Sequence, residues 1–157
     1  MGAIERLTEF YGQKEHRSDW LEVTQDRINQ FADCTLDHNW IHIDPERCFR
    51  ESPFGGPIAH GQWTLSTLPY LIESALGGLR PPGIQMGVNY GFGRVRMMTP
   101  VHVGKRIRNH LKLIEIQAKG GNRYVVKTEN TIEIEGAAKP ALVADWLFMV
   151  FVDDQAS

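Results

Sequence analysis

The sequence predicts an α+β fold in which one long buried helix is wrapped by a curved antiparallel sheet. Residues 61–78 have a helical pattern that is apolar on most of its faces, which is typical of a buried helix. Between residues 83 and 152, apolar side chains alternate with polar ones at a period of two, as in long strands. Residues 36–60, just before the helix, show little periodicity of either kind.

Length and composition limit the class of protein. The chain has 157 residues, of which 42% are hydrophobic and 10% aromatic, so we expect one domain over residues 1–157 with a sizeable core. A net charge of −2 gives no general attraction to nucleic acid or to an anionic membrane, and no apolar run is long enough to span a bilayer. Cys34 and Cys48 form no CxxC pair and no signal-peptide pattern occurs, so we expect reduced thiols in a cytoplasmic protein.

The N-terminal third predicts two helices and a short strand. Residues 4–11 form a helical pattern that Gly12 ends, and residues 18–24 suit a half-buried strand. Thr24 is the expected N-cap of a second helix that ends near Leu36. The apolar stripe of that helix has helical spacing: Ile28, Phe31, Ala32 and Thr35.

The buried helix should contain one irregularity. Gly77 and Gly78 are expected to stop it. Pro69 lies inside it and has no N–H to donate to the carbonyl of Leu65, so we expect a kink there.

Four long antiparallel strands should follow. Residues 84–90, 101–113 and 124–134 alternate between apolar and polar, and residues 120–122 (GGN) predict a hairpin turn. Residues 141–152 are apolar on both faces, which is typical of a central strand or of one covered by a partner.

The weakly periodic segment at residues 36–60 is longer than connections in compact domains usually are, and such loops tend to be functional. Asp37 and His42 lie in it as a possible acid–base pair for activating water. Gly61 begins the buried helix, where an unsatisfied amide and the absence of a Cβ would let a carbonyl oxygen approach. These groups suit either the hydration of a conjugated C=C bond or the hydrolysis of an acyl group.

Each residue also has a purely structural interpretation. Asp37 and Asn39 suit a turn after a helix, His42 suits a hydrogen-bonded core histidine, and His60 with Gly61 suits a helix start. The acids and histidines of the segment show no metal-binding spacing, so we expect no metal and no cofactor. Ser66 lies in no GxSxG motif, so we expect no serine nucleophile.

The strings FADCTLDHNWIH and PFGGPIAHG together resemble the signature of the MaoC-like (R)-specific enoyl-CoA hydratases, also called hydratase 2. Trp40 and the string DPER make the sequence most similar to the nodulation protein N-like branch of this family. The similarity extends over about residues 18–152. Two positions depart from the family pattern, in which Leu36 is usually glycine and Trp40 is usually proline. The matching positions are Asp37, Asn39, Ile41, His42, His60 and Gly61.

The resemblance implies a hot-dog fold, in which the segment at residues 36–60 is an overhang above the substrate. It also implies a homodimer joined edge to edge, with an acyl-CoA channel near the interface. The implied reaction is the (R)-specific, reversible hydration of trans-2-enoyl-CoA. Asp37 would take a proton from one water, His42 would orient that water and protonate C2, and the Gly61 amide would stabilise the thioester oxygen.

Further residues would bind or position the substrate. The resemblance gives such roles to Asn39 and His60, and the CoA phosphates need a local basic cluster, for which a solvated strand face is the alternative interpretation. Two other functions use the same fold: a hot-dog acyl-CoA thioesterase and a non-catalytic acyl-CoA-binding protein. The candidate basic residues are Arg94, Arg96, Lys105, Arg106 and Arg108.

Overall fold

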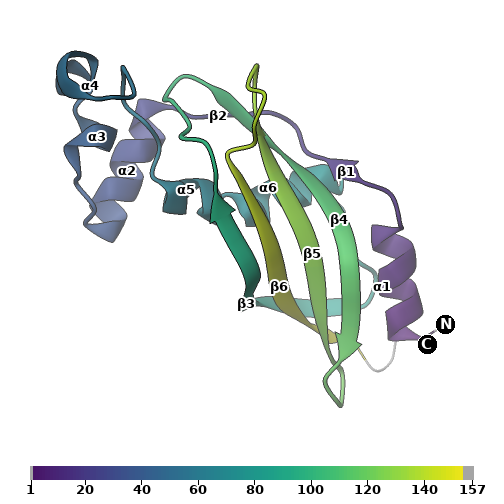
Figure 1. Ribbon diagram of the computed structural model, residues 1–157. Coiled ribbons are helices and arrows are strands. Elements are labelled where there is room, and N and C mark those ends of the chain that lie inside the picture. The colour runs from purple at the N-terminus through teal and green to yellow at the C-terminus, as the bar shows by residue number, and fades with distance from the viewer. Residues whose placement is uncertain (1, 154–157) are drawn as a thin grey trace.

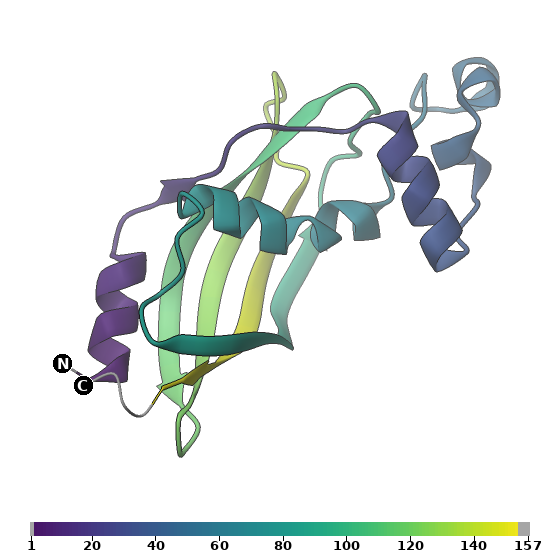
Figure 2. The same ribbon diagram turned by 180° about the vertical axis from the view of Figure 1, so that it is seen from behind.

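The computed structural model describes residues 2–153, with helices packed against one face of a curved antiparallel sheet (Figures 1 and 2). The helices are α1 (Ala3–Tyr11), α2 (Gln25–Thr35), α3 (Trp40–Ile43), α4 (Pro45–Glu51), α5 (Gly61–Ser66) and α6 (Leu68–Ala75). The strands are β1 (His16–Arg17), β2 (Leu21–Glu22), β3 (Ile84–Met97), β4 (Arg106–Ala118), β5 (Arg123–Ile134) and β6 (Leu142–Val152).

The strand order is β1-β4-β5-β6-β3, and β2 also pairs with β4. Every pairing is antiparallel. Figure 2 shows α5 and α6 running across one face of the sheet, while α2, α3 and α4 form a lobe beside it. The predicted α+β hot-dog fold is therefore confirmed, with a long edge strand, β3, on one side.

The alternation that predicted the strands has its expected cause. In β5, Val126, Thr128, Asn130 and Ile132 are all fully buried, because they face the helices. Strand β6 lies between β5 and β3, so it is the central strand that the sequence predicted. Its residues mostly alternate between buried and partly exposed, because the helices cover only one face of the sheet.

The sequence predicted a kink at Pro69, and this position is wrong. The helix is instead divided into α5 and α6, with the break at Thr67, two residues earlier. Pro69 then lies in the first turn of α6, where the missing N–H leaves no helical bond unmade. The Thr67 amide still donates to the carbonyl of Trp63, at 3.1 Å, so the two helices continue in nearly the same path.

The segment at residues 36–60 is more regular than the sequence suggested. It contains α3 and α4, which are capped by the side chains of Asn39 and Asp44. Helices of four and seven residues make too few turns to show a periodicity, so the pattern missed them.

Two predicted strands are also shorter than expected. Residues 18–24 contribute only to β2, and β4 begins at Arg106 rather than at residue 101. Residues before β4 pair instead with the end of the overhang, since the Ala59 amide donates to the carbonyl of Val101 at 2.8 Å and the Val103 amide to Pro57 at 3.0 Å. This pairing fixes the chain just before α5.

No helix in the described part of the chain is long and apolar enough to cross a membrane. Cys34 is exposed, Cys48 is buried, and both are free thiols.

Candidate active site

His42 is held in one orientation by two hydrogen bonds. Its Nδ1 lies 2.7 Å from the carbonyl oxygen of Ile58, and its own carbonyl accepts a bond of 2.7 Å from Gln25 Nε2. A carbonyl oxygen can only accept, so Nδ1 carries the hydrogen. In the neutral ring, Nε2 therefore has a free lone pair. The residue is only 8% exposed.

Burial lowers the pKa of His42 below its usual value of 6.5, and the neighbouring His60 lowers the pKa further. The bond to Ile58 and the charge of Asp37 oppose this shift without reversing it. Near neutral pH the imidazole is thus uncharged, and its Nε2 is a proton acceptor.

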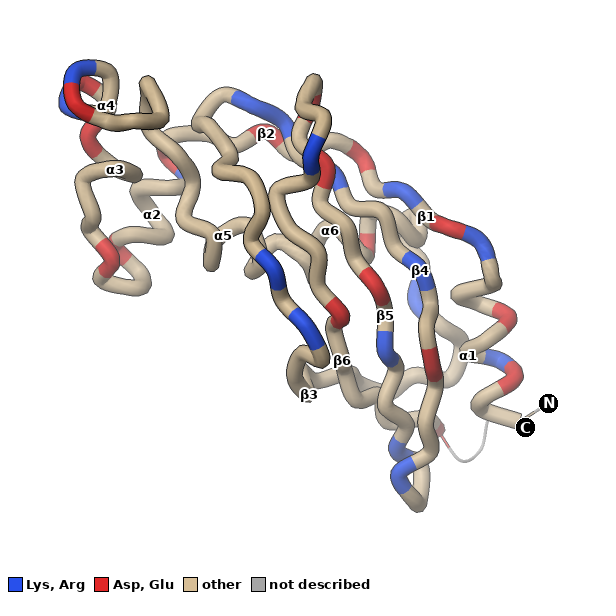
Figure 3. The backbone as a smooth tube through the Cα atoms, viewed as in Figure 1, with Lys and Arg blue, Asp and Glu red and all other residues tan. Residues whose placement is uncertain are grey.

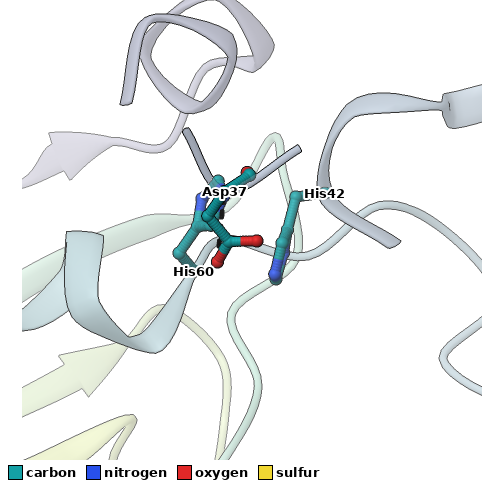
Figure 4. A group of neighbouring side chains, drawn as sticks. All are labelled: Asp37, His42 and His60. Atoms are coloured by element: carbon teal, nitrogen blue, oxygen red, sulfur yellow. Dashed lines mark hydrogen bonds and ion pairs between the residues drawn. The ribbon is translucent and has the colours of Figure 1, made fainter. Parts of the chain in front are cut away.

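Asp37 is turned toward the histidines by its own backbone. Leu36, at the end of α2, has the left-handed conformation with φ of 63°, which reverses the chain. The Asp37 carbonyl then accepts a bond of 3.0 Å from His60 Nε2, and its carboxylate accepts a longer one of 3.4 Å from the Asn39 amide. Figure 4 shows the carboxylate directed toward the rings of His42 and His60.

His60 is buried and contacts both His42 and Asp37. It is 2% exposed, and its ring stacks on that of His42 with centroids 3.8 Å apart and planes 29° from parallel. Phe31 packs against it, at 5.0 Å between centroids. The structure therefore places His60 in the packed interior, where it contacts Asp37 and His42.

Asp37, His42 and His60 each place one potential ligand atom within 4.8 Å of the others. A metal ion bound by two imidazoles lies near the plane of both rings, along their nitrogen lone pairs. Stacked rings direct those lone pairs side by side rather than toward one point, and the Nε2 hydrogen of His60 is already bonded to Asp37. The arrangement is better suited to moving a proton than to holding a metal.

A cavity of about 310 Å³ opens beside His42. Gly61, the first residue of α5, contributes to its wall, and its N–H has no acceptor within the described residues. The cavity is predominantly apolar, as sites for acyl groups are. Its lining includes His42, Gly61, Thr64, Met97, Met98 and Leu142.

The basic residues lie elsewhere. Arg94 is on the outer face of the sheet, 3.3 Å from Asp145 and 3.5 Å from Glu129. Arg96 lies on that same face of β3, and no ion pair involves it in the described part of the chain. Figure 3 shows the basic residues of β3 and β4 beside acidic residues of β5 and β6. The structure thus does not bring Arg94 or Arg96 into the cavity.

Sequence reasoning missed four contributors to the site. Thr64 follows Gly61 by three residues, so helical spacing offered a signal for it. The sequence contained no signal for the Ile58 carbonyl, because a backbone atom is the same in every residue type. Met97 and Met98 come from the end of β3 and its first following residue, and no local pattern connects them with the overhang.

The fold and the site together define a class: a hot-dog domain with an Asp–His pair beside an apolar cavity. Residues 7–135 match the model of the family described as MaoC like domain, and the chain belongs to this MaoC-like family. Nodulation protein N of Rhizobium leguminosarum bv. viciae is 45% identical over 142 residues, covering 90% of this chain and 87% of the relative. The 3-hydroxyacyl-thioester dehydratase Z of Mycobacterium tuberculosis is 42% identical over 134 residues, covering 85% and 86%. The resemblance to the family and to its nodulation protein N-like branch is confirmed.

Solved structures share the fold at lower identity. A monoamine oxidase regulatory protein from Archaeoglobus fulgidus superposes with a TM-score of 0.75 at 23% identity, covering 89% of this chain and 90% of its own. An (R)-hydratase from A. caviae superposes with a TM-score of 0.68 at 18% identity, covering 87% and 93%. At these identities the likeness establishes the hot-dog fold.

Proposed function

We propose that this protein catalyses the reversible hydration of trans-2-enoyl thioesters to (R)-3-hydroxyacyl thioesters, with CoA as the carrier. One observation carries the proposal: His42, fixed in one tautomer, has a free Nε2 beside the carboxylate of Asp37. The names of two relatives, a 3-hydroxyacyl-thioester dehydratase and an (R)-hydratase, support the same reaction.

The chemistry begins with one water between His42 Nε2 and the Asp37 carboxylate. Both groups are acceptors, so the water directs one hydrogen to each and its lone pair to C3 of the enoyl thioester. As the C3–O bond forms, an O–H bond of the water breaks and its proton passes to Nε2. The electron pair of the C=C bond moves onto the thioester oxygen, where the Gly61 amide stabilises the charge.

The second step returns the proton. The imidazolium of His42 gives it to C2, which restores the thioester carbonyl and the neutral ring. Since the same nitrogen takes and returns the proton, C3–O and C2–H form on one face of the double bond. The sequence-based expectation was that Asp37 takes the proton and His42 protonates C2. The proposed sequence of steps differs because a neutral His42 has no Nε2 hydrogen to give at the outset.

The supporting residues then have distinct roles. Asn39 and His60 are positioning residues that hold Asp37, through the Asn39 amide and through His60 Nε2. Arg94 and Arg96 remain candidates for contacts to the CoA phosphates. Arg96 is the better supported of the two, since Arg94 is already paired with Asp145 and Glu129.

We also propose a homodimer formed through the free edge of β3. This strand has 14 residues and pairs with β6 on one side only. An exposed apolar edge of that length favours pairing with a second strand. Its exposed apolar residues are Met86, Val88, Tyr90, Phe92, Val95 and Met97.

Loss of ultraviolet absorbance from crotonyl-CoA tests the activity. We expect Asp37→Asn and His42→Ala each to lower kcat by about a hundredfold or more, with unchanged circular dichroism. Wild-type rates in both variants would contradict the assignment.

The same assay separates the alternatives. A thioesterase would release free CoA thiol, which a thiol reagent detects, whereas a hydratase releases none. A non-catalytic acyl-CoA-binding protein would bind crotonyl-CoA without turnover. Comparing CoA with acyl-carrier-protein thioesters at equal concentration identifies the carrier.

A further inference from the structure

The thioether of Met97 rests directly on the Cα of Gly61. A Cβ built on Gly61 would lie 2.6 Å from Met97 Sδ and 3.3 Å from its Cε. Non-bonded carbon and sulfur atoms do not approach to 2.6 Å, so no side chain fits at position 61 while Met97 keeps this position. Two residues 36 positions apart in the chain thus form one wall of the cavity beside His42.

Met97 comes from the end of β3, opposite Leu142 on β6, and its side chain is directed to the helix side of the sheet. The residue is 47% exposed, so only part of it is held by packing. Methionine is unbranched and flexible, so its side chain can move to accommodate small groups in the cavity while still excluding larger ones.

We propose that Met97 determines which acyl thioesters the site accepts, by limiting the size of the substituent on C2. This inference rests on the proposed function. The thioester oxygen would bind at the Gly61 amide and C3 would lie at the water beside His42, so C2 lies between them. Met97 Sδ lies 2.6 Å from where a Cβ of Gly61 would be, so a substrate bound in this way has the thioether next to C2. An unbranched C2 fits against the thioether, whereas a methyl group on C2 meets it.

The test compares crotonyl-CoA with 2-methylcrotonyl-CoA, which differ by one methyl group on C2. In Met97→Ala, the ratio of kcat/KM for the branched to the unbranched substrate should rise about tenfold or more, the usual effect of one carbon in an apolar pocket. Met86→Ala is the matched control, because Met86 is on the same strand and 53% exposed but does not line the cavity. An unchanged ratio in Met97→Ala would overturn the proposal.

A double-mutant cycle tests the contact itself. Gly61→Ala should lower kcat/KM for crotonyl-CoA, and adding Met97→Ala should recover about tenfold, because the new Cβ then occupies vacated space. Equal losses in both backgrounds would contradict the steric link between the two residues.

The outcomes separate this inference from the proposed function. A wild-type protein that does not hydrate crotonyl-CoA would overturn the proposed function. The role of Met97 would then be measured from the affinities for the two thioesters by calorimetry. A branched-to-unbranched affinity ratio that Met97→Ala raises supports the role, and one that it leaves unchanged overturns it.

Discussion

The ring of His60 stacks on the ring of His42 at 3.8 Å, and its Nε2 donates to the backbone carbonyl of Asp37 at 3.0 Å. One buried side chain therefore contacts both members of the proposed acid–base pair. These two members come from different elements, since Asp37 follows α2 and His42 belongs to α3. His60 fixes their relative position without lining the cavity.

Replacing His60 should affect both stability and turnover. His60→Ala leaves a void under His42 and a carbonyl of Asp37 without its donor, so we expect the free energy of unfolding to fall by about 2 to 4 kcal/mol. We expect kcat to fall with little change in KM, because the pair loses its geometry while the cavity keeps its lining. Urea denaturation and steady-state kinetics measure the two effects.

His38→Ala is the matched control, since His38 is an exposed histidine of the same segment, bonded to Asp33. It should leave both quantities nearly unchanged. A folded His60→Ala variant with wild-type kcat would contradict the positioning role.

The hydration rate should depend on the protonation of His42. Its pKa is lowered from 6.5 by burial, so the ring is neutral at pH 7 and becomes charged only at lower pH. We therefore expect kcat/KM to be highest where the ring is neutral and to fall as acidic solution protonates it. A pH–rate profile with crotonyl-CoA measures this, and a rate that rises on acidification below pH 6.5 would show that charged His42 is the active form.

The same shift acts on stability. His42 binds its proton more weakly in the folded state than in the unfolded state. The contribution of neutral His42 to the stability of the fold is therefore fully present above the unfolded-state pKa. That contribution is lost as the pH falls from about 6.5 through the lowered folded-state pKa. Circular dichroism at each pH separates unfolding from direct titration of the site.

Replacing Leu36 by glycine should stabilise the protein. It is the one non-glycine residue with positive φ in the described part of the chain, and it is 80% exposed, so its side chain contributes little burial. Leu36→Gly relieves the left-handed strain, and we expect the free energy of unfolding to rise by up to about 1 kcal/mol.

Chemical denaturation measures the effect, with Leu79→Gly as control. Leu79 is 65% exposed and does not have positive φ, so glycine there relieves no strain and adds backbone freedom to the unfolded chain. Destabilisation by Leu36→Gly as large as that by Leu79→Gly would rule out the strain.

A charge on the free edge should separate the proposed dimer. Val88 is 45% exposed on β3, and Val88→Lys would bury a charge between two paired edges. We expect sedimentation to show a monomer for this variant and a dimer for wild type. Ile114→Lys, at a site 50% exposed on β4, should leave the dimer intact. A monomeric wild type would contradict the edge-to-edge dimer.

Much of the fold could be predicted because its elements are long. Strands β3 to β6 have 11 to 14 residues each, enough for alternation to be recognised. Thr24 caps α2 as expected, accepting a bond of 3.3 Å from the Arg27 amide. By contrast, α3 and α4 are too short to show periodicity, although Asn39 and Asp44 before them are good N-caps.

The sequence by itself determined the class of fold, because hydrophobic periodicity marks long strands and a buried helix. It also supplied the three groups proposed for catalysis, through residue type, the predicted helix start and the match to the family motif. Only the tertiary structure decided how they work. The tautomer of His42 depends on the carbonyl of Ile58, and the wall at Gly61 depends on Met97, from a distant strand. Neither contact is local, so no periodicity records it, and packing alone brings these atoms together.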